Sequence, residues 1–415
     1  MTDEPLRVAL LTYKGNPFCG GQGVYVRNLS RELVRLGHQV DVFSGQPYPV
    51  LDPGVRLIEV PSLDLYREPD PFRMPKLREY RDWVDALEVA TMMTAGFPEP
   101  MTFALRARRL LRHQPERYDV VHDNQSLGYG LLRLGRPLVS TVHHPVQIDR
   151  RLELAAATGL RRLSLRRWYG FTRTQARVAR RLGHIITVSE SSRSEVVELM
   201  GVAPQRIDVI AVGTDVDSFA PDPTVARIPG RIVTTASADV PLKGLLPLVE
   251  AVAKLRTERP VELVVVGSAR PGGPVATAIE RYGLADAVRF TGRISDDEVR
   301  HHLRSAEVAV VPSLFEGFSL PLIEAMACAT PVVATTGGAL PEVAGADGET
   351  VLLVPPGDAE ALAAAIGRAL ADPGLRARIG AAGRERVVQR FTWRAAAVAT
   401  VEVYRRARLS YLDGR

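Results

Sequence analysis

The chain has 415 residues, 46% of them apolar and 24% charged, and carries a net charge of +6. This is the composition of a soluble globular protein, and the length is too great for a single hydrophobic core, so two domains are expected. With only two cysteines, a disulfide framework is excluded. No apolar run approaches the roughly 20 residues that a membrane span needs. The sequence contains no base-reading motif, so nucleic-acid binding is not indicated.

Short apolar runs separated by helical segments recur along the whole chain. In the first half, strands are predicted at Arg7–Thr12, Gln39–Ser44, Val55–Val60, Val120–His122, Leu138–Thr141, Ile185–Val188 and Ile207–Val212. In the second half they are predicted at Arg231–Ser237, Val261–Val266, Val288–Thr291, Val308–Val311, Val332–Ala334 and Val351–Val354. This alternation predicts two doubly wound α/β domains, 1–212 and 213–393, joined through the aperiodic segment Gly213–Pro229.

Ligands of open α/β sheets bind beyond the carboxyl ends of the strands. The glycine-rich loop Tyr13–Gly23 follows the first predicted strand, contains Gly20 and Gly21, and precedes a predicted helix at Val24–Leu36. Bare glycines let a backbone approach a phosphate or a sugar closely, although glycine turns after strands are also ordinary structure. The run is not Gly-x-Gly-x-x-Gly, so a nicotinamide dinucleotide is not indicated.

Two histidines, His143 and His144, follow the predicted strand Leu138–Thr141. A histidine at that place can hold or deprotonate a hydroxyl near neutral pH, and an ordinary loop histidine is the structural alternative.

The stretch from Pro312 to Glu342 has the strongest pattern in the chain. After the strand Val308–Val311 comes a turn, and Pro321 stands where a helix, Leu322–Cys328, is predicted to begin. A helix start at a strand end favours an anion, above all a phosphate. One carboxylate, Glu316, stands before this helix and another, Glu324, within it, so each end of a bound diphosphate would lie near one acid.

Glu316 and Glu324, with Gly-Phe-Ser-Leu-Pro between them, resemble the signature of glycosyltransferase family 4. Further segments that resemble the family sequence follow at Thr336-Gly337-Gly338, Pro341-Glu342, Leu353–Asp358, Gly383–Val387 and Phe391-Thr392-Trp393. The resemblance therefore covers most of the chain after Val212. It implies the GT-B fold, which has two Rossmann-like domains facing each other across a cleft. It also implies a retaining, nucleotide-sugar-dependent hexosyltransferase in which the final helix, 394–415, packs back on the acceptor-binding first domain.

The resemblance also implies residue roles. Glu316, Lys243 and His143 would be the catalytic residues. Glu316 would hold hydroxyls of the donor sugar, Lys243 would neutralise the departing diphosphate, and His143, which matches the family position better than His144, would lie close to the transferring sugar. Glu324 would take the ribose hydroxyls, and the loop Thr291–Ser295 would read the base through its backbone. The implied donor-binding set is Gly20, Gly21, Gly317, Phe318, Ser319, Leu320, Glu324 and Arg293.

Lys243 has no arginine partner in this sequence. The family usually carries an arginine five residues earlier, where this chain has Ala238, so two charge-assisted contacts to the diphosphate become one. Arg270 and Arg293, each after a later strand, are the candidate replacements. Asp215-Val216-Asp217 resembles the metal motif of other sugar transferases, but it lies in the predicted hinge, so no required metal is expected.

The segment 150–181 is not explained by a donor site. It holds ten arginines and a single acid, Glu153, with leucines and aromatic residues between them. A solvated helix pair is one interpretation, and a basic amphipathic surface for anionic lipid or an anionic acceptor is the other.

The sequence therefore predicts a metal-independent, retaining glycosyltransferase that moves a hexose from a UDP- or GDP-sugar to an acceptor hydroxyl in glycan or glycolipid synthesis. We expect it in the cytoplasm, with peripheral membrane contact through 150–181 as one hypothesis. The alternatives are another GT-B enzyme, such as a sugar-nucleotide epimerase, and a non-catalytic sugar-nucleotide-binding protein.

Overall fold

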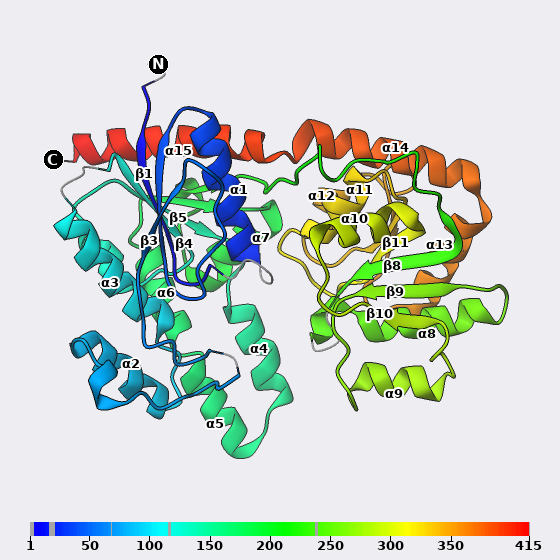
Figure 1. The fold of residues 1–415 in the computed structure, drawn as a ribbon, viewed down its shortest axis with the longest axis horizontal. Helices are drawn as coiled ribbons and strands as arrows, with labels where there is room; N and C mark the ends of the chain where they lie inside the picture. The colour runs from blue at the N-terminus through cyan, green and yellow to red at the C-terminus, as the bar shows by residue number, and fades with distance from the viewer. Residues whose placement is uncertain (1–3, 16–20, 68, 115–117, 237–239, 415) are drawn as a thin grey trace. The chain divides into compact units, whose positions relative to one another are not determined.

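The computed structural model describes residues 4–15, 21–67, 69–114, 118–236 and 240–414 (Figure 1). The chain divides into two compact units, Met1–Ile210 with Ala396–Arg415, and Ala211–Ala395. The sequence had placed these divisions two residues later and two residues earlier, at 212 and 394.

The first unit is built on a seven-stranded parallel sheet in the order β3-β2-β1-β4-β5-β6-β7. Its strands are β1 Arg7–Thr12, β2 Gln39–Ser44, β3 Arg56–Glu59, β4 Val120–Asn124, β5 Leu138–Val142, β6 His184–Thr187 and β7 Ile207–Val209. Its helices are α1 Gly21–Arg35, α2 Trp83–Met93, α3 Glu99–His113, α4 Gln147–Ala156, α5 Gly159–Trp168, α6 Phe171–Ala179, α7 Glu190–Glu195 and, from Ala396 on, α15 Trp393–Asp413.

The second unit has a six-stranded parallel sheet in the order β10-β9-β8-β11-β12-β13. Its strands are β8 Ile228–Thr235, β9 Glu262–Val266, β10 Val288–Phe290, β11 Ala306–Val311, β12 Val332–Thr335 and β13 Leu352–Val354. Its helices are α8 Leu245–Arg256, α9 Pro274–Arg281, α10 Asp296–Ser305, α11 Leu320–Ala327, α12 Leu340–Ala344, α13 Ala359–Ala371 and α14 Pro373–Arg390. The predicted α/β class is confirmed in both units.

Central strands form where apolar runs are covered on both faces, as parallel sheets require. In β1 the residues Val8 to Leu11 are fully buried, and β1 pairs with β2 and β4 in uninterrupted register. In the second unit Ile232, Leu263 and Val308 of the sheet pack with Leu248 and other side chains of the covering helices. Both sheets therefore hold their carboxyl-terminal edges in fixed positions.

Two predicted helix starts were wrong by a few residues. Helix α1 begins at Gly21 and not at Val24, because Gly23 is buried within the first helical turn and the glycines of the expected loop tolerate helical geometry at a modest cost. Helix α11 begins at Leu320 and not at Leu322, because Pro321 lies in the first turn, where no backbone N–H is needed. The predicted edge strand Ile207–Val212 ends at Val209, as the chain then leaves for the second unit.

Candidate active site

Helix α11 begins directly after a residue with a strained backbone. Ser319, the residue before this helix, has φ 92° and ψ 89°, a region that a serine rarely adopts and that costs about 1–3 kcal/mol. Its hydroxyl is buried and, among the described residues, finds no hydrogen-bond partner. An unsatisfied buried hydroxyl is costly unless a ligand supplies the missing partner.

Glu316 lies in the turn between β11 and α11 and is fixed from two sides. Lys243 Nζ and Ser313 Oγ each lie 2.7 Å from Glu316 Oε1. The Glu316 side chain is 12% exposed and that of Lys243 is 33% exposed, so the pair is reachable from solvent. The structure thus brings together two of the three predicted catalytic residues.

Close backbone contacts hold this turn in place, and glycine is required at three of them. A Cβ at Gly244, where φ is +65°, would lie 1.8 Å from the Pro312 carbonyl oxygen. A Cβ at Gly337 or Gly338 would meet the Leu314 or Glu316 carbonyl oxygen at 2.5 or 2.3 Å. The predicted similarity around Gly337 and Gly338 therefore has a structural cause, which is the packing of β12's exit against the Glu316 turn.

Glu324 lies in the second turn of α11 and is partly buried. Burial, with a smaller contribution from Asp296, raises the pKa of this carboxyl to about 7. A hydroxyl pair that donates to the carboxylate would favour the ionised form, because hydrogen bonds to a charged acceptor are the strong ones.

The other predicted site residues of the second unit differ in burial. Phe318 is buried against Phe391, with ring centroids 5.6 Å apart. Arg293 is exposed in the loop after β10, and Arg270 is exposed after β9. Ala238, at the position of the missing arginine, lies outside the described residues.

In the first unit His143 follows β5 and is held by the side chains of Asn124, the last residue of β4, and Gln125, the residue after it. Its Nε2 lies 2.7 Å from Asn124 Oδ1, and its backbone N–H donates to Gln125 Oε1 at 2.8 Å. Burial, followed by the charge of His144, lowers the pKa of His143 to about 3, so the ring is neutral at pH 7. Because Asn124 Oδ1 only accepts, the proton sits on Nε2 and leaves Nδ1 as an acceptor.

His144 faces a different partner. Its Nε2 lies 3.0 Å from Asp149 Oδ2, and its side chain is 40% exposed. The two histidines therefore differ in burial and in the charge of their neighbours.

A buried polar chain lies behind His143. His122 Nδ1 is 2.6 Å from the Tyr404 hydroxyl of α15, and His122 Nε2 is 2.7 Å from Thr141 Oγ1. The Tyr25 hydroxyl also bonds Thr141, at 3.1 Å, and the Tyr25 ring meets the His143 ring edge-on at 4.7 Å. Burial lowers the pKa of His122 to about 3, so this chain is neutral.

Sequence reasoning missed Ser313, Asn124 and this polar chain. The available signal was their position, since Asn124 ends β4 and Ser313 is the second residue after β11. Of the two predicted glycines, Gly21 is the first residue of α1, and a Cβ there would meet nothing within 4 Å. Gly20 lies outside the described residues.

The Asp215–Asp217 motif forms a turn. Asp215 Oδ1 accepts from the backbone N–H groups of Asp217 and Ser218 at 3.3 and 3.2 Å. Across the described residues no group of three or more histidine, cysteine or acidic side chains is placed to hold a metal ion. Nor is any described helix long and apolar enough to cross a lipid bilayer.

Known proteins resemble the chain over nearly its full length. Residues 19–218 match the family described as Glycosyltransferase Family 4, and residues 229–372 match Glycosyl transferases group 1. The chain is 52% identical to the MMP α-(1→4)-mannosyltransferase of Mycolicibacterium hassiacum, over 97% of this chain and 98% of that protein. It is 32% identical to the D-inositol 3-phosphate glycosyltransferase of Kineococcus radiotolerans, over 97% and 95% of the two chains.

Among solved structures, the sucrose-phosphate synthase of Thermosynechococcus elongatus superposes with a TM-score of 0.73 at 26% identity, covering 97% of this chain and 98% of that one. Two parallel sheets with this likeness define a GT-B glycosyltransferase, as the sequence predicted. The chain belongs to glycosyltransferase family 4, whose members use nucleotide-sugar donors, and it is a hexosyltransferase.

Proposed function

We propose that the chain is a retaining mannosyltransferase that forms an α-(1→4) bond with mannose from a UDP- or GDP-linked donor. The sugar and the linkage rest on the name of the 52% identical relative. The structural observation that carries the donor site is Ser319, a strained residue with a buried unpartnered hydroxyl at the start of α11. A diphosphate there would meet the backbone N–H groups of residues 318–320 and satisfy that hydroxyl.

Each side chain around the start of α11 would have a separate role in donor binding. Lys243 would neutralise charge as the nucleoside diphosphate leaves, while Ser313 keeps Glu316 in place to hold hydroxyls of the donor sugar. Glu324 would accept from the ribose hydroxyls. Arg293 would supply the second positive charge that the position of Ala238 lacks. No metal takes part in this scheme.

The reaction itself needs no protein nucleophile. The bond between the anomeric carbon and the phosphate oxygen breaks, and the acceptor hydroxyl attacks from the same face. The leaving phosphate takes the acceptor proton. In the first unit, Nδ1 of neutral His143 would accept from a sugar hydroxyl. Gly20 and Gly21 would let the backbone approach the donor, which agrees with the empty space beside Gly21. The donor would thus bind mainly to the second unit and the acceptor mainly to the first.

Product analysis tests this function. The protein is incubated with GDP-mannose or UDP-mannose and an α-(1→4)-linked mannose oligosaccharide, and the product is analysed for chain length and anomeric linkage. We expect one added α-linked mannose with release of the nucleoside diphosphate. An epimerised nucleotide sugar would support the sugar-nucleotide epimerase, and tight nucleotide binding without product would support the non-catalytic binding protein.

The basic segment 150–181 supports a second proposal, peripheral contact with anionic lipid on the cytoplasmic side. Helix α5 has no buried side chain, and its Leu160 and Leu163 are 85% and 63% exposed. Its arginines flank these leucines, while the one acid of the segment, Glu153, accepts from the Tyr169 hydroxyl at 2.7 Å. Exposed leucines among arginines suit a lipid surface.

Vesicle sedimentation tests this contact. At low salt, anionic vesicles should sediment the protein and neutral vesicles should not, and Leu160→Ser with Leu163→Ser should weaken the binding. Equal sedimentation with both kinds of vesicle, or with neither, would refute the lipid contact. The remaining interpretation, an anionic or lipid-linked acceptor held by these arginines, would then be tested by acceptor competition.

A further inference from the structure

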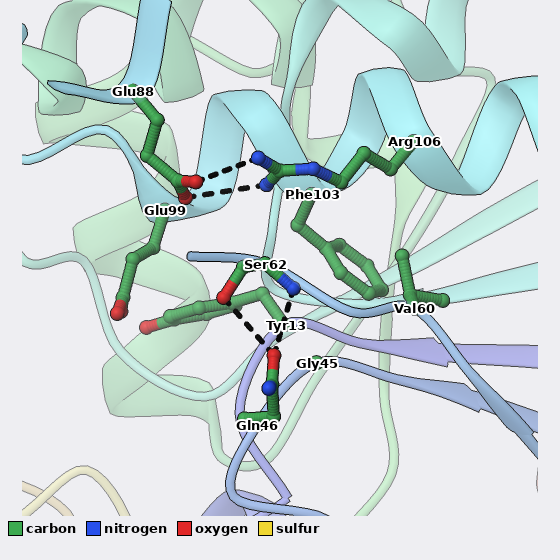
Figure 2. A pocket seen from close by; sticks show the side chains of 9 residues that line it. All are labelled: Tyr13, Gly45, Gln46, Val60, Ser62, Glu88, Glu99, Phe103 and Arg106. Atoms are coloured by element: carbon green, nitrogen blue, oxygen red, sulfur yellow. Dashed lines mark hydrogen bonds and ion pairs between the residues drawn. The ribbon is translucent and has the colours of Figure 1, made fainter. Parts of the chain in front are cut away.

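A small polar cavity lies at the carboxyl ends of β1, β2 and β3 in the first unit, where open α/β sheets bind their ligands (Figure 2). Its polar lining is Tyr13, Gln46, Ser62, Glu88, Glu99 and Arg106. The cavity volume is about 10 Å³, enough for about one water molecule. None of the donor-binding roles proposed above uses these residues.

Part of this lining is committed to structure. Arg106 Nη2 lies 2.6 Å from both Glu88 Oε2 and Asp85 Oδ1, and Thr102 Oγ1 also donates to Glu88. Figure 2 shows the Arg106 and Glu88 side chains joined across one wall of the cavity. This wall is internally paired.

Two other groups retain hydrogen-bonding capacity. Gln46 Oε1 accepts from the backbone N–H and the hydroxyl of Ser62, at 2.7 and 3.1 Å, which fixes the amide orientation. Within the described part of the chain no residue accepts from Gln46 Nε2. Among the described residues, Glu99, at the first position of α3, pairs with Lys14 Nζ at 2.7 Å through Oε2. Burial raises the pKa of Glu99 to about 7, and Lys14 opposes that shift.

Lys14 joins this polar group to a cluster of aromatic rings. Its Nζ lies 5.7 Å from the ring centroid of Tyr66 and 5.4 Å from that of Phe97. Trp168 of α5 lies 5.6 Å from Tyr66 and 5.0 Å from Phe97, between ring centroids. All three rings are partly buried, so each keeps some accessible surface.

A carboxylate and an amide beside partly exposed rings suit a neutral sugar, because its hydroxyls donate to the carboxylate and its C–H faces pack on the rings. An anionic ligand is disfavoured, because Lys14 and Arg106 are already paired with acids. We propose that the Tyr66–Phe97–Trp168 rings form a subsite for a neutral oligosaccharide acceptor, with one sugar hydroxyl taking the water-sized space beside Glu99 and Gln46. This proposal rests on the sugar-transfer function proposed above.

Steady-state kinetics with a neutral α-(1→4)-linked mannose oligosaccharide test the subsite. We expect Glu99→Gln to raise the acceptor KM about tenfold or more, and Trp168→Ala about tenfold. Trp168→Phe keeps a ring and should stay within about threefold of the parent chain. The donor KM should change in none of them. Glu32→Gln is the matched control, since Glu32 is a buried acid of the same unit that pairs with Arg35 at the last turn of α1.

Binding of the same oligosaccharide, followed by saturation-transfer NMR on the nucleotide-loaded protein, separates the two proposals. Binding that Trp168→Ala abolishes, in a protein without transfer activity, would support the subsite and refute the function. Transfer with an unchanged acceptor KM in Glu99→Gln and Trp168→Ala would refute the subsite and leave the function standing. Lowered thermal stability with unchanged KM would show that the rings serve packing alone.

Discussion

Polar side chains at the strand ends are bonded in opposite ways in the two units. Behind His143 in the first unit, His122, Thr141 and Tyr404 are fully buried and bonded to one another. At the start of α11 in the second unit, Ser319 is strained and lacks a partner among the described residues. A closed network rigidifies its surroundings, whereas an open one leaves bonds for a ligand. We therefore expect the first unit to hold His143 in a fixed position and the second unit to bind the charged diphosphate.

Among the variants considered, removal of the Glu316 carboxylate should lower turnover the most. Glu316→Ala deletes the acid that Ser313 and Lys243 hold, and turnover should fall about 10²- to 10³-fold, as for other groups that stabilise a transition state. The fold should stay intact, which thermal unfolding checks. Full turnover in this variant would contradict the assignment of the donor site.

Lys243 has a matched control in its own unit. Lys243→Ala should lower turnover about 10²-fold, by loss of the cation beside the diphosphate. Lys254 pairs with Glu360 on the surface of the same unit and, with Lys243, is one of its two lysines. Lys254→Ala should leave turnover unchanged, and equal losses in the two variants would argue against a specific role for Lys243.

Glu324 should make donor binding depend on pH. Its pKa of about 7 means that the carboxyl is about half protonated at neutral pH in the free protein. Ribose hydroxyls bind the ionised form, so affinity for the nucleoside diphosphate should rise about tenfold from pH 6 to pH 8. Calorimetric titrations should show a flat profile for Glu324→Gln. A parallel rise in that variant would assign the pH dependence to another group.

The buried network around His122 in the first unit should make the free energy of unfolding depend on pH in the acid range. The folded-state pKa of His122 is about 3 against 6.5 for an ordinary histidine, so the unfolded chain binds more protons between these values. Stability from this residue is full above about pH 6.5 and falls as the pH decreases, by about 2 kcal/mol at pH 5. Glu99, Glu195 and Glu324, with raised pKa values, act in the opposite direction between pH 4.5 and 7.

A variant isolates the histidine from these acids. Urea unfolding of the parent chain and of His122→Asn is compared at pH 7 and pH 5. The parent chain should lose about 2 kcal/mol more than the variant between the two conditions. Equal losses would show that His122 is not buried in the neutral form.

Replacement of Ser319 should have the smallest effect, and it should change stability and ligand affinity in opposite directions. Ser319→Gly relieves the positive φ, so the free energy of unfolding should rise by about 1 kcal/mol. The same variant should bind the nucleoside diphosphate more weakly, because the hydroxyl is gone. Unfolding and titration on one sample measure both, and tighter binding in the variant would count against the hydroxyl contact.

The sequence predicted the strands closely because uninterrupted apolar runs are buried on both faces of each sheet. The roles of Glu316, Glu324 and Lys243 stay predictions that rest on the family resemblance, and the structure adds the ion pair between Lys243 and Glu316. Ser313 and Asn124 were missed because their contacts join segments that only the folded chain brings together. The left-handed Ser319 could not be foreseen, since glycine and not serine marks that conformation in a sequence.

A crystal structure of the protein with its nucleoside diphosphate tests the central claim most directly. The account predicts diphosphate oxygens about 3 Å from Ser319 Oγ and from the backbone N–H of Leu320, with the ribose hydroxyls on Glu324. A diphosphate bound away from the start of α11, with Ser319 Oγ still unpartnered, would contradict it.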